Sequence, residues 1–351
     1  MQRFLRKLAM SASVAVSLVA ASAAAADPVE ITVSSWLPPT HSLVAGFIVP
    51  WMAEVEKATE GRVKPRLLPK AVTNPAGHYD AVRNGLVDIS FISHAYYPGR
   101  FDLTKLAVLP FAGDHAEARS IAAWRIYDKY LKGAGEHRGV HLLGLYGHGP
   151  GMVMTASKPV RTIGDFNGLK VRIGGGMAAD VAKVLGVNAV VKPAPESYEL
   201  LSTGVVDGVF FPAEALTAFK LDEVVRHMTR FPGGLYSDSH AFIMNESTYK
   251  KLDSKDRATL DRLAGEHAAR MAGAAWGGSD IKALAVAKNK GIEIIEADEQ
   301  LMSAVRTRTA QFEQDWLAAA KKHNIDGPTV MAEYRQMLKT LDAEIAARPA
   351  K

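Results

Sequence analysis

Two hydrophobic spacings alternate along this chain, and together they predict an α/β protein. Short apolar or alternating runs bounded by turn residues are typical of β-strands. They fall at residues 31–33, 63–68, 87–92, 140–146, 169–173, 189–192, 207–211, 241–245 and 291–296. Helical stretches lie between them, for instance at residues 42–59 and 74–84. Strands that alternate with helices predict largely parallel sheets with helices on their faces.

Apolar stripes at helical spacing predict that the last quarter of the chain is helical. The first stripe consists of Leu260, Leu263, His267 and Met271. The second consists of Leu301, Val305, Phe312 and Trp316. Asp253 or Ser254 suits the N-cap of the first helix, and Asp298 suits that of the second. We interpret both stripes as faces that pack on a core rather than as binding surfaces.

The N-terminus has the three parts of a secretory signal peptide. Arg3, Arg6 and Lys7 supply the positive charge, residues 8–21 are apolar, and small residues up to Ala26 form the cleavage site. A membrane anchor is the competing interpretation, but this stretch is rich in Ala and Ser. Beyond it, no unbroken apolar run approaches the length that spans a bilayer. We therefore expect an exported protein without stable membrane insertion after signal cleavage.

Composition and charge exclude several classes of function. The formal net charge of the 351 residues is +5, and removal of the three cations of the signal gives 5 − 3, that is +2. No basic tract is interleaved with aromatic residues, so we expect no nucleic-acid partner. The absence of cysteine excludes thiolate metal sites and cysteine nucleophiles. No dinucleotide, phosphate-loop, zinc-protease or serine-hydrolase motif is present, so no metal or cofactor is expected.

Arg172 is the candidate with the clearest chemistry. It lies at the end of the strand predicted at residues 169–173 and is followed by the three glycines 174–176. An arginine in this position can present its planar fork to a carboxylate without crowding from neighbouring side chains. On the strand pattern alone, a solvated arginine on an exposed face remains the alternative.

Four segments give the chain a family resemblance. Residues 157–172, 196–208, 85–89 and 106–111 resemble, in order and spacing, motifs of the DctP-type extracytoplasmic solute-binding subunits of tripartite ATP-independent periplasmic (TRAP) transporters. The resemblance implies a periplasmic protein that delivers its solute to small and large membrane subunits coupled to an ion gradient. It also implies that Arg172 clamps the ligand carboxylate, as the arginine in the same motif does in that family.

The same resemblance implies a two-lobed periplasmic binding protein fold with a hinged cleft and a helical C-terminal layer. Gly-Pro-Gly at residues 149–151 and Pro-Gly-Gly at 232–234 punctuate the chain where two crossings between lobes are expected. We expect the following division. Residues 1–26 form the signal peptide, 27–149 plus 240–290 lobe 1, 150–239 lobe 2, and 291–351 a helical segment that packs on the lobes.

Three departures from the family pattern suggest the class of ligand. Phe211 stands where many members carry an asparagine, and Met152 where the sialic-acid-binding members carry an arginine. Ala194 takes a position that is often a bulky aromatic residue. Two polar contacts have thus become apolar, which favours a ligand with one carboxylate and a sizeable apolar or aromatic body. Neutral substitution in a packed wall is the alternative.

The remaining candidates lie in loops that follow predicted strands, where a doubly wound fold places its cleft. Trp36 either stacks on a flat ligand or covers the core. Either Tyr97 or its neighbour Tyr96 is expected to reach the cleft, and we choose Tyr97 as the site residue. Glu214 either complements a helix N-terminus or accepts a hydrogen bond from a ligand hydroxyl or amine. Weaker candidates of the same kind are Tyr236, Asp238 and His240.

The sequence therefore predicts a periplasmic solute-binding protein for an organic acid, and not an enzyme. One alternative is an exported enzyme that acts on small carboxylates, with Glu214, Asp238 or His240 as its base or nucleophile. Another is the sensor subunit of a membrane receptor.

Overall fold

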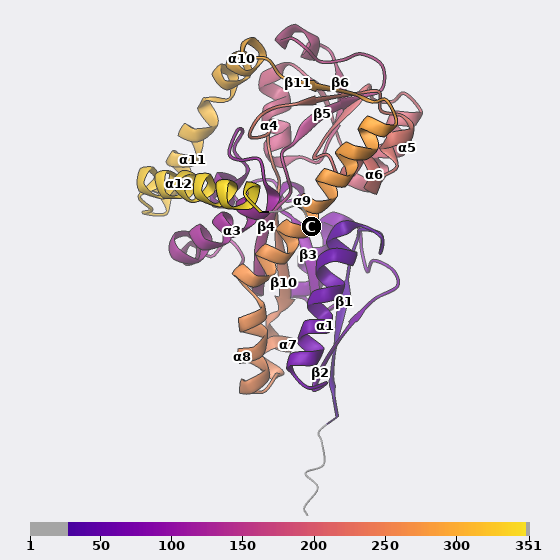
Figure 1. Cartoon of the computed structure of the whole chain (residues 1–351). Helices are drawn as coiled ribbons and strands as arrows, with labels where there is room; N and C mark the ends of the chain where they lie inside the picture. The colour runs from indigo at the N-terminus through magenta and orange to yellow at the C-terminus, as the bar shows by residue number, and fades with distance from the viewer. Residues whose placement is uncertain (1–26, 349–351) are drawn as a thin grey trace, which may run out of the picture.

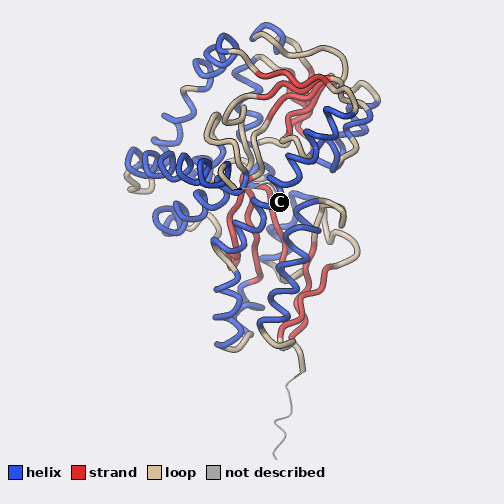
Figure 2. The backbone as a smooth tube through the Cα atoms, viewed as in Figure 1, coloured by secondary structure: helices blue, strands red, loops and turns tan. Residues whose placement is uncertain are grey.

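The computed structural model describes residues 27–348, in which two β-sheets form the centres of two lobes (Figure 1). The predicted signal peptide, residues 1–26, lies outside the described residues. In Figure 2 the strands gather in two separate groups with helices around each. We call the part around the five-stranded sheet lobe 1 and the part around the six-stranded sheet lobe 2.

The sheet of lobe 1 has the strand order β2-β1-β3-β10-β4. Its strands are β1 (Val29–Ser34), β2 (Val63–Leu67), β3 (Ile89–Ser93), β4 (Val140–Gly147) and β10 (Ser239–Asn245). Its helices are α1 (Val49–Ala58), α2 (His78–Arg83), α3 (Ala116–Ile126), α7 (Glu246–Lys251) and α8 (Ser254–Leu263). Alternate residues of β10 enter different cores: Phe242 and Met244 pack toward Trp51 of α1, whereas Ala241 and Ile243 pack toward Tyr79 of α2. Successive side chains of β10 thus point to opposite faces of the sheet, and both faces are covered.

The sheet of lobe 2 has the strand order β11-β9-β5-β8-β6-β7. Its strands are β5 (Met152–Thr155), β6 (Lys170–Ile173), β7 (Asn188–Val191), β8 (Gly208–Phe211), β9 (His227–Arg230) and β11 (Glu293–Glu296). Its helices are α4 (Gly176–Leu185), α5 (Ser197–Ser202) and α6 (Ala215–Ala218).

The expectation of largely parallel sheets is wrong at one strand in each lobe. β10 runs antiparallel to both β3 and β4, and β5 runs antiparallel to both β8 and β9. The reason is that residues 148–151 and 231–238 connect the two sheets in opposite directions. The two crossing segments lie side by side, because Gly151 N donates to Tyr236 O at 2.8 Å and Leu235 N donates to Gly151 O at 2.9 Å. Strands that continue from such segments must run in opposite directions.

The C-terminal region is helical, as predicted, and joins the two lobes. α9 (Glu266–Asn289) runs from lobe 1 into lobe 2 in Figure 1, and α10 (Glu299–Thr309), α11 (Gln311–Lys322) and α12 (Gly327–Ala346) follow β11. Buried Val305, Trp316 and Val330 share a core with Ile121 of α3 and Val181 of α4. The second predicted stripe is therefore a packing face, and Asp298 caps its first helix by accepting from Leu301 N at 2.8 Å.

The first predicted stripe is broken between Leu263 and His267. Gly265 separates α8 from α9 with a φ of 64°, which only glycine adopts without strain. A Cβ atom there would lie 2.9 Å from the ring of Trp124. The chain thus bends sharply where the helical spacing of the sequence continues.

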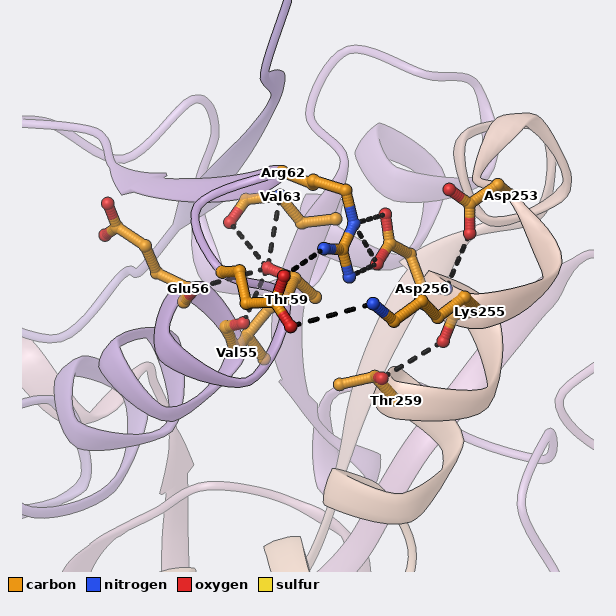
Figure 3. Close-up of polar contacts among 10 residues, drawn as sticks. Val55, Glu56, Thr59, Arg62, Val63, Asp253, Lys255, Asp256 and Thr259 are labelled. Atoms are coloured by element: carbon orange, nitrogen blue, oxygen red, sulfur yellow. Dashed lines mark hydrogen bonds and ion pairs between the residues drawn. The ribbon is translucent and has the colours of Figure 1, made fainter. Parts of the chain in front are cut away.

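Polar contacts fix α8 to the turn between α1 and β2 (Figure 3). Arg62 donates to Asp256 Oδ1 from Nε at 3.1 Å and from Nη2 at 2.8 Å. Asp253 caps α8, as predicted, by accepting from Asp256 N at 2.7 Å. These contacts lie at the end of lobe 1 that is remote from lobe 2.

Candidate ligand-binding site

A cavity lies between the two lobes, with about 580 Å³ of empty space that includes its opening to solvent. Loops that follow β1, β3, β6 and β8 supply most of its wall, and the crossing before β10 and the middle of α9 supply the rest. Both sheets thus contribute the carboxyl ends of parallel strands, which is where α/β folds bind ligands.

Arg172 is buried at one end of the cavity, with 1% of its surface exposed. Its Nε and Nη2 atoms donate to the carbonyl oxygen of Lys192 at 2.9 and 2.6 Å. These bonds fix one edge of the guanidinium group. Nη1 has no hydrogen bond of good geometry within residues 27–348, so a ligand can reach the edge formed by Nη1 and Nη2. A ligand there would also meet Tyr96, whose hydroxyl raises the pKa of Arg172 against the larger effect of burial. Burial lowers the pKa of Arg172, which means that its charge lacks full compensation.

Aromatic rings surround this arginine. The guanidinium carbon lies 4.4 Å from the ring centre of Phe211, which in turn stacks on Phe219 at 5.5 Å. Trp36 lines the cavity and packs on Phe91 at 4.8 Å. Its indole N–H already donates to Phe91 O at 3.3 Å, so Trp36 offers a ring face rather than a hydrogen bond. The cavity therefore combines one cation with flat apolar walls.

Among the two neighbouring tyrosines, Tyr96 reaches the cavity and Tyr97 does not. The Tyr96 hydroxyl accepts from Ala194 N at 3.1 Å and so connects lobe 1 to lobe 2. The Tyr97 hydroxyl accepts from Tyr79 N at 3.0 Å, inside lobe 1. The choice of Tyr97 is thus not supported by the geometry, because consecutive side chains at the end of this short 3₁₀ turn point in different directions.

The structure brings most of the other predicted residues to the cavity, with one exception. Ala194, Phe211, Glu214 and Tyr236 all line it. Met152 does not line it. Met152 is paired with Phe211 across β5 and β8 and lines a separate hollow together with Pro232.

An acidic side chain lies near Arg172. Asp238 lines the cavity and accepts a short hydrogen bond from the Ser93 hydroxyl. Burial raises the pKa of Asp238 to about 7. The chain therefore supplies a group near the arginine that can accept a hydrogen bond from a ligand or donate one to it.

Two acidic side chains lie close together where α9 passes the cavity. Asp280 of α9 accepts from the backbone N–H of Glu214 at 2.8 Å. Burial raises the pKa of Asp280 to about 7 and, together with the charge of Asp280, raises that of Glu214 to about 8. Both carboxyl groups are 8% exposed or less. The folded state thus favours their protonated forms.

Asp280→Asn is expected to stabilise the ligand-free protein at high pH. The pKa of Asp280 is higher in the folded than in the unfolded chain, so its stabilising contribution is present below about pH 4 and is lost as pH rises through about 7. Asparagine keeps the acceptor for Glu214 N–H and carries no charge. Thermal unfolding should therefore give the variant a melting temperature several degrees above wild type at about pH 8.5, with a gap that narrows toward about pH 5. An equal melting temperature at all pH values contradicts this.

Sequence reasoning missed several lining residues. His41, Phe219 and Trp276 line the cavity but carry no motif. Trp276 lies in a helical stretch of small residues, where its spacing indicates only a core position. The sequence indicated only that the glycines at 174–176 leave Arg172 uncrowded, and not that Gly175 lies close to Ala95 of lobe 1. Such contacts between lobes have no signal in a single sequence.

The two-lobed α/β fold with a cavity between the lobes defines the class of extracytoplasmic solute-binding proteins. The chain belongs to the family of bacterial extracellular solute-binding proteins, family 7, called DctP, whose family model matches residues 33–319. It is a DctP-type solute-binding protein of TRAP transporters, as the sequence motifs predicted. No helix in the described part of the chain is long and apolar enough to cross a membrane.

Solved structures of the same kind resemble this chain over most of its length. A TRAP solute-binding protein from Bordetella bronchiseptica with bound (R)- and (S)-mandelate is 63% identical, with a TM-score of 0.88, and the match covers 90% of this chain and 100% of that one. A protein from an unidentified marine microbe, described as specific for aromatic acids and holding 3-hydroxybenzoate, is 28% identical with a TM-score of 0.83, over 90% and 99% of the chains. A protein from Rhodoferax ferrireducens with benzoate is 25% identical with a TM-score of 0.83, over 91% and 100%.

Proposed function

We propose that this protein captures an aromatic monocarboxylate of the mandelate or benzoate kind and delivers it to the small and large membrane subunits of a TRAP permease. The observation that carries this proposal is the accessible guanidinium edge of Arg172 in a cavity whose other walls are largely aromatic. In this proposal the chain is exported to the periplasm and its signal is cleaved near Ala26. The aromatic-acid ligands of the similar solved structures support it.

The ligand carboxylate lies on the Nη1–Nη2 edge of Arg172 as a bidentate pair, which fixes both its position and its direction. The ring then lies against Phe211 and the face of Trp36. Burial of ~100 Å² of ligand surface contributes about 2.5 kcal/mol before ordering costs. An α-hydroxyl, as in mandelate, falls within the region of Asp238 and Tyr96, both of which can form hydrogen bonds.

Ligand binding favours the state in which both lobes contact the solute. We propose that residues 27–149 with β10, α7 and α8 move as lobe 1 and that residues 150–239 move as lobe 2. α9, which the expected division assigned to lobe 1 with the rest of residues 240–290, connects the two, because its Ala283 and Ala287 pack in the core of lobe 2. The helical segment from residue 291 packs on both. Its first strand, β11, pairs with β9 and therefore moves with lobe 2.

We propose binding without catalysis, although the family assignment alone leaves an enzyme possible. Glu214, Asp238 and His240, the candidate bases, all line the cavity. Burial raises the pKa of both carboxyl groups and lowers that of His240. Chromatography after prolonged incubation with a bound aryl acid should recover the acid unchanged, and a new product would favour the enzyme. A receptor sensor is the other alternative, and adjacent genes for two permease subunits would argue against it.

Calorimetric titration with a matched set of acids tests the ligand class. Mandelate and benzoate should bind at least ~10-fold more tightly than a C4 dicarboxylate, a sugar acid or a branched 2-oxo acid. A second carboxylate would be desolvated against Phe211 and Phe219 without a partner, which is costly in a dry cavity. Tightest binding of the dicarboxylate or the sugar acid would contradict the proposal and leave the family assignment intact.

A further inference from the structure

Unsatisfied polar atoms gather at a part of the cavity that the carboxylate does not use. Within residues 27–348, the buried atoms Glu214 Oε2, Trp276 Nε1 and His240 Nδ1 have no hydrogen bond of good geometry, and all three residues line the cavity. Trp276 is nevertheless near enough to Glu214 to lower the pKa of that carboxyl group through a hydrogen bond, against the larger effect of burial. The three atoms come from three different elements: the segment after β8, α9 and β10. Buried polar atoms are normally paired, because an unpaired one loses its hydration without a replacement. Their convergence in one cavity indicates a place for a polar ligand group.

Aromatic rings separate this place from Arg172. The guanidinium group lies on Phe211, Phe211 stacks on Phe219, and Phe219 lies 5.7 Å from the ring of His41. His41 Nε2 is 3.5 Å from Glu214 Oε2. Besides burial, which lowers it, the pKa of Arg172 responds to Asp238, which raises it. Besides burial, which raises it, the pKa of Glu214 responds to Asp280, which raises it further. The two residues thus have different charged neighbours. The cavity therefore has two polar regions, at Arg172 and at Glu214, and the rings of Phe211 and Phe219 lie between them.

The partners at this second region suit a group that both donates and accepts hydrogen bonds. Trp276 Nε1 is only a donor, and an oxygen of Glu214 accepts. His41 Nδ1 accepts from Leu43 N at 3.1 Å, so its neutral ring carries the proton on Nε2, which faces Glu214 at a distance too long for a good bond. Burial favours the protonated form of Glu214, so its carboxyl group can donate as well as accept, whereas an ammonium group cannot accept from Trp276 and is excluded. A hydroxyl fits all of these constraints.

We infer that Glu214 and Trp276 form a hydroxyl-recognition subsite, which selects aryl acids that carry a ring hydroxyl remote from the carboxylate. This inference rests on the proposed function, because Arg172 must hold the carboxylate for the ring to reach the subsite. The Glu214 side chain forms no capping bond to α6 within the described residues, and its neighbours at this point are His41 and Trp276. An ordered water that bridges Glu214 and Trp276 is the competing occupant, and the experiment separates the two.

The test compares mandelate with 3-hydroxymandelate and 4-hydroxymandelate by calorimetric titration. In wild type, at least one hydroxylated acid should bind ~10-fold more tightly than mandelate. Glu214→Leu, an apolar replacement of similar size, should abolish this preference, read as the ratio of the hydroxymandelate to the mandelate affinity. Glu214→Gln should keep most of the preference, because its amide both donates and accepts. Trp276→Phe removes the indole donor together with part of the ring, so it should weaken the preference, read as the ratio of the two affinities.

Asp256→Asn is the control, because Asp256 is a buried carboxylate of α8 that does not line the cavity, and its variant should leave the preference unchanged. If no hydroxylated acid is preferred in wild type, a water or nothing occupies the subsite and the inference is wrong. An equal preference in wild type and Glu214→Leu also overturns it. If Glu214→Leu does not fold, Trp276→Phe decides. If mandelate itself does not bind, the proposed function fails and the subsite with it, whereas mandelate binding without hydroxyl preference removes only the subsite.

Discussion

Replacing Arg172 with methionine is expected to abolish aryl-acid binding while making the ligand-free protein more stable to heat. The side chain is 1% exposed, burial lowers its pKa, and within residues 27–348 no carboxylate is hydrogen-bonded to it. Loss of one partner of a buried charge pair should reduce affinity by at least ~100-fold, or about 3 kcal/mol. A buried charge without its partner destabilises the empty protein, so an apolar side chain of similar length should raise the melting temperature.

Arg172→Lys isolates the role of the planar fork. Lysine keeps the charge, but its ammonium group has no two edges with which to bond the Lys192 carbonyl and a ligand carboxylate at the same time. The affinity should therefore still fall at least ~10-fold. Arg161→Met is the matched control, because Arg161 is an exposed arginine of lobe 2 paired with Glu293. Titration calorimetry and differential scanning calorimetry give the two readouts. Unchanged affinity in both Arg172 variants, with cooperative unfolding, would remove Arg172 from the site.

Gly175→Ala is expected to weaken ligand binding by about 10–100-fold, because it obstructs contact between the lobes. A Cβ atom on Gly175 would lie 2.6 Å from the carbonyl oxygen of Ala95, which belongs to lobe 1. The backbone at Gly175 also has a φ of 110°, where a side chain costs about 1–3 kcal/mol. The closed form therefore bears both penalties, whereas an open form bears only the second. Small-angle scattering with saturating mandelate should show less compaction than in wild type.

Two other glycines, Gly174 and Gly168, allow the effect of the added methyl group to be distinguished from that of the positive φ. Gly174→Ala adds a methyl group whose nearest contacts are 3.7 Å or more away, so it controls for size. Gly168→Ala imposes a positive φ, here 74°, with no atom of the described chain within 4 Å, so it controls for backbone strain. Wild-type affinity and compaction in Gly175→Ala would mean that Gly175 and Ala95 need not meet in the bound state.

Local patterns were enough to predict the strands that carry the site. The strand that carries Arg172 and the turn before it could be predicted from residues 167–173 alone. The alternation of apolar and charged residues and the glycine of the turn are both local signals. The strand pattern alone did not predict a ligand-binding role for Arg172, whereas the resemblance to the family motif did. The N-caps Asp253 and Asp298 were equally local, since a cap depends on the backbone two or three residues on.

What the sequence could not predict depends on contacts between distant segments. Met152 and Phe211 are neighbours across two strands, but only one of them faces the cavity, and no spacing rule distinguishes them. Tyr96 and Tyr97 differ by one position in a 3₁₀ turn whose phase is set by packing against lobe 2. At the break between α8 and α9, the ring of Trp124, far away in sequence, leaves no room for a Cβ atom on residue 265.

The buried acids of the cavity also set its charge balance. Below pH 7, Glu214 and Asp238 are mainly protonated, because their pKa values are about 8 and about 7. Burial lowers the pKa of each lining histidine, so these rings are neutral as well: His41, His148 and His240. Arg172 is then the one charged side chain among the described residues that line the cavity. A monoanion brings the enclosed volume to electroneutrality, whereas a dianion leaves an unbalanced charge in a medium of low permittivity. The fold thereby sorts its ligands by valence as well as by shape.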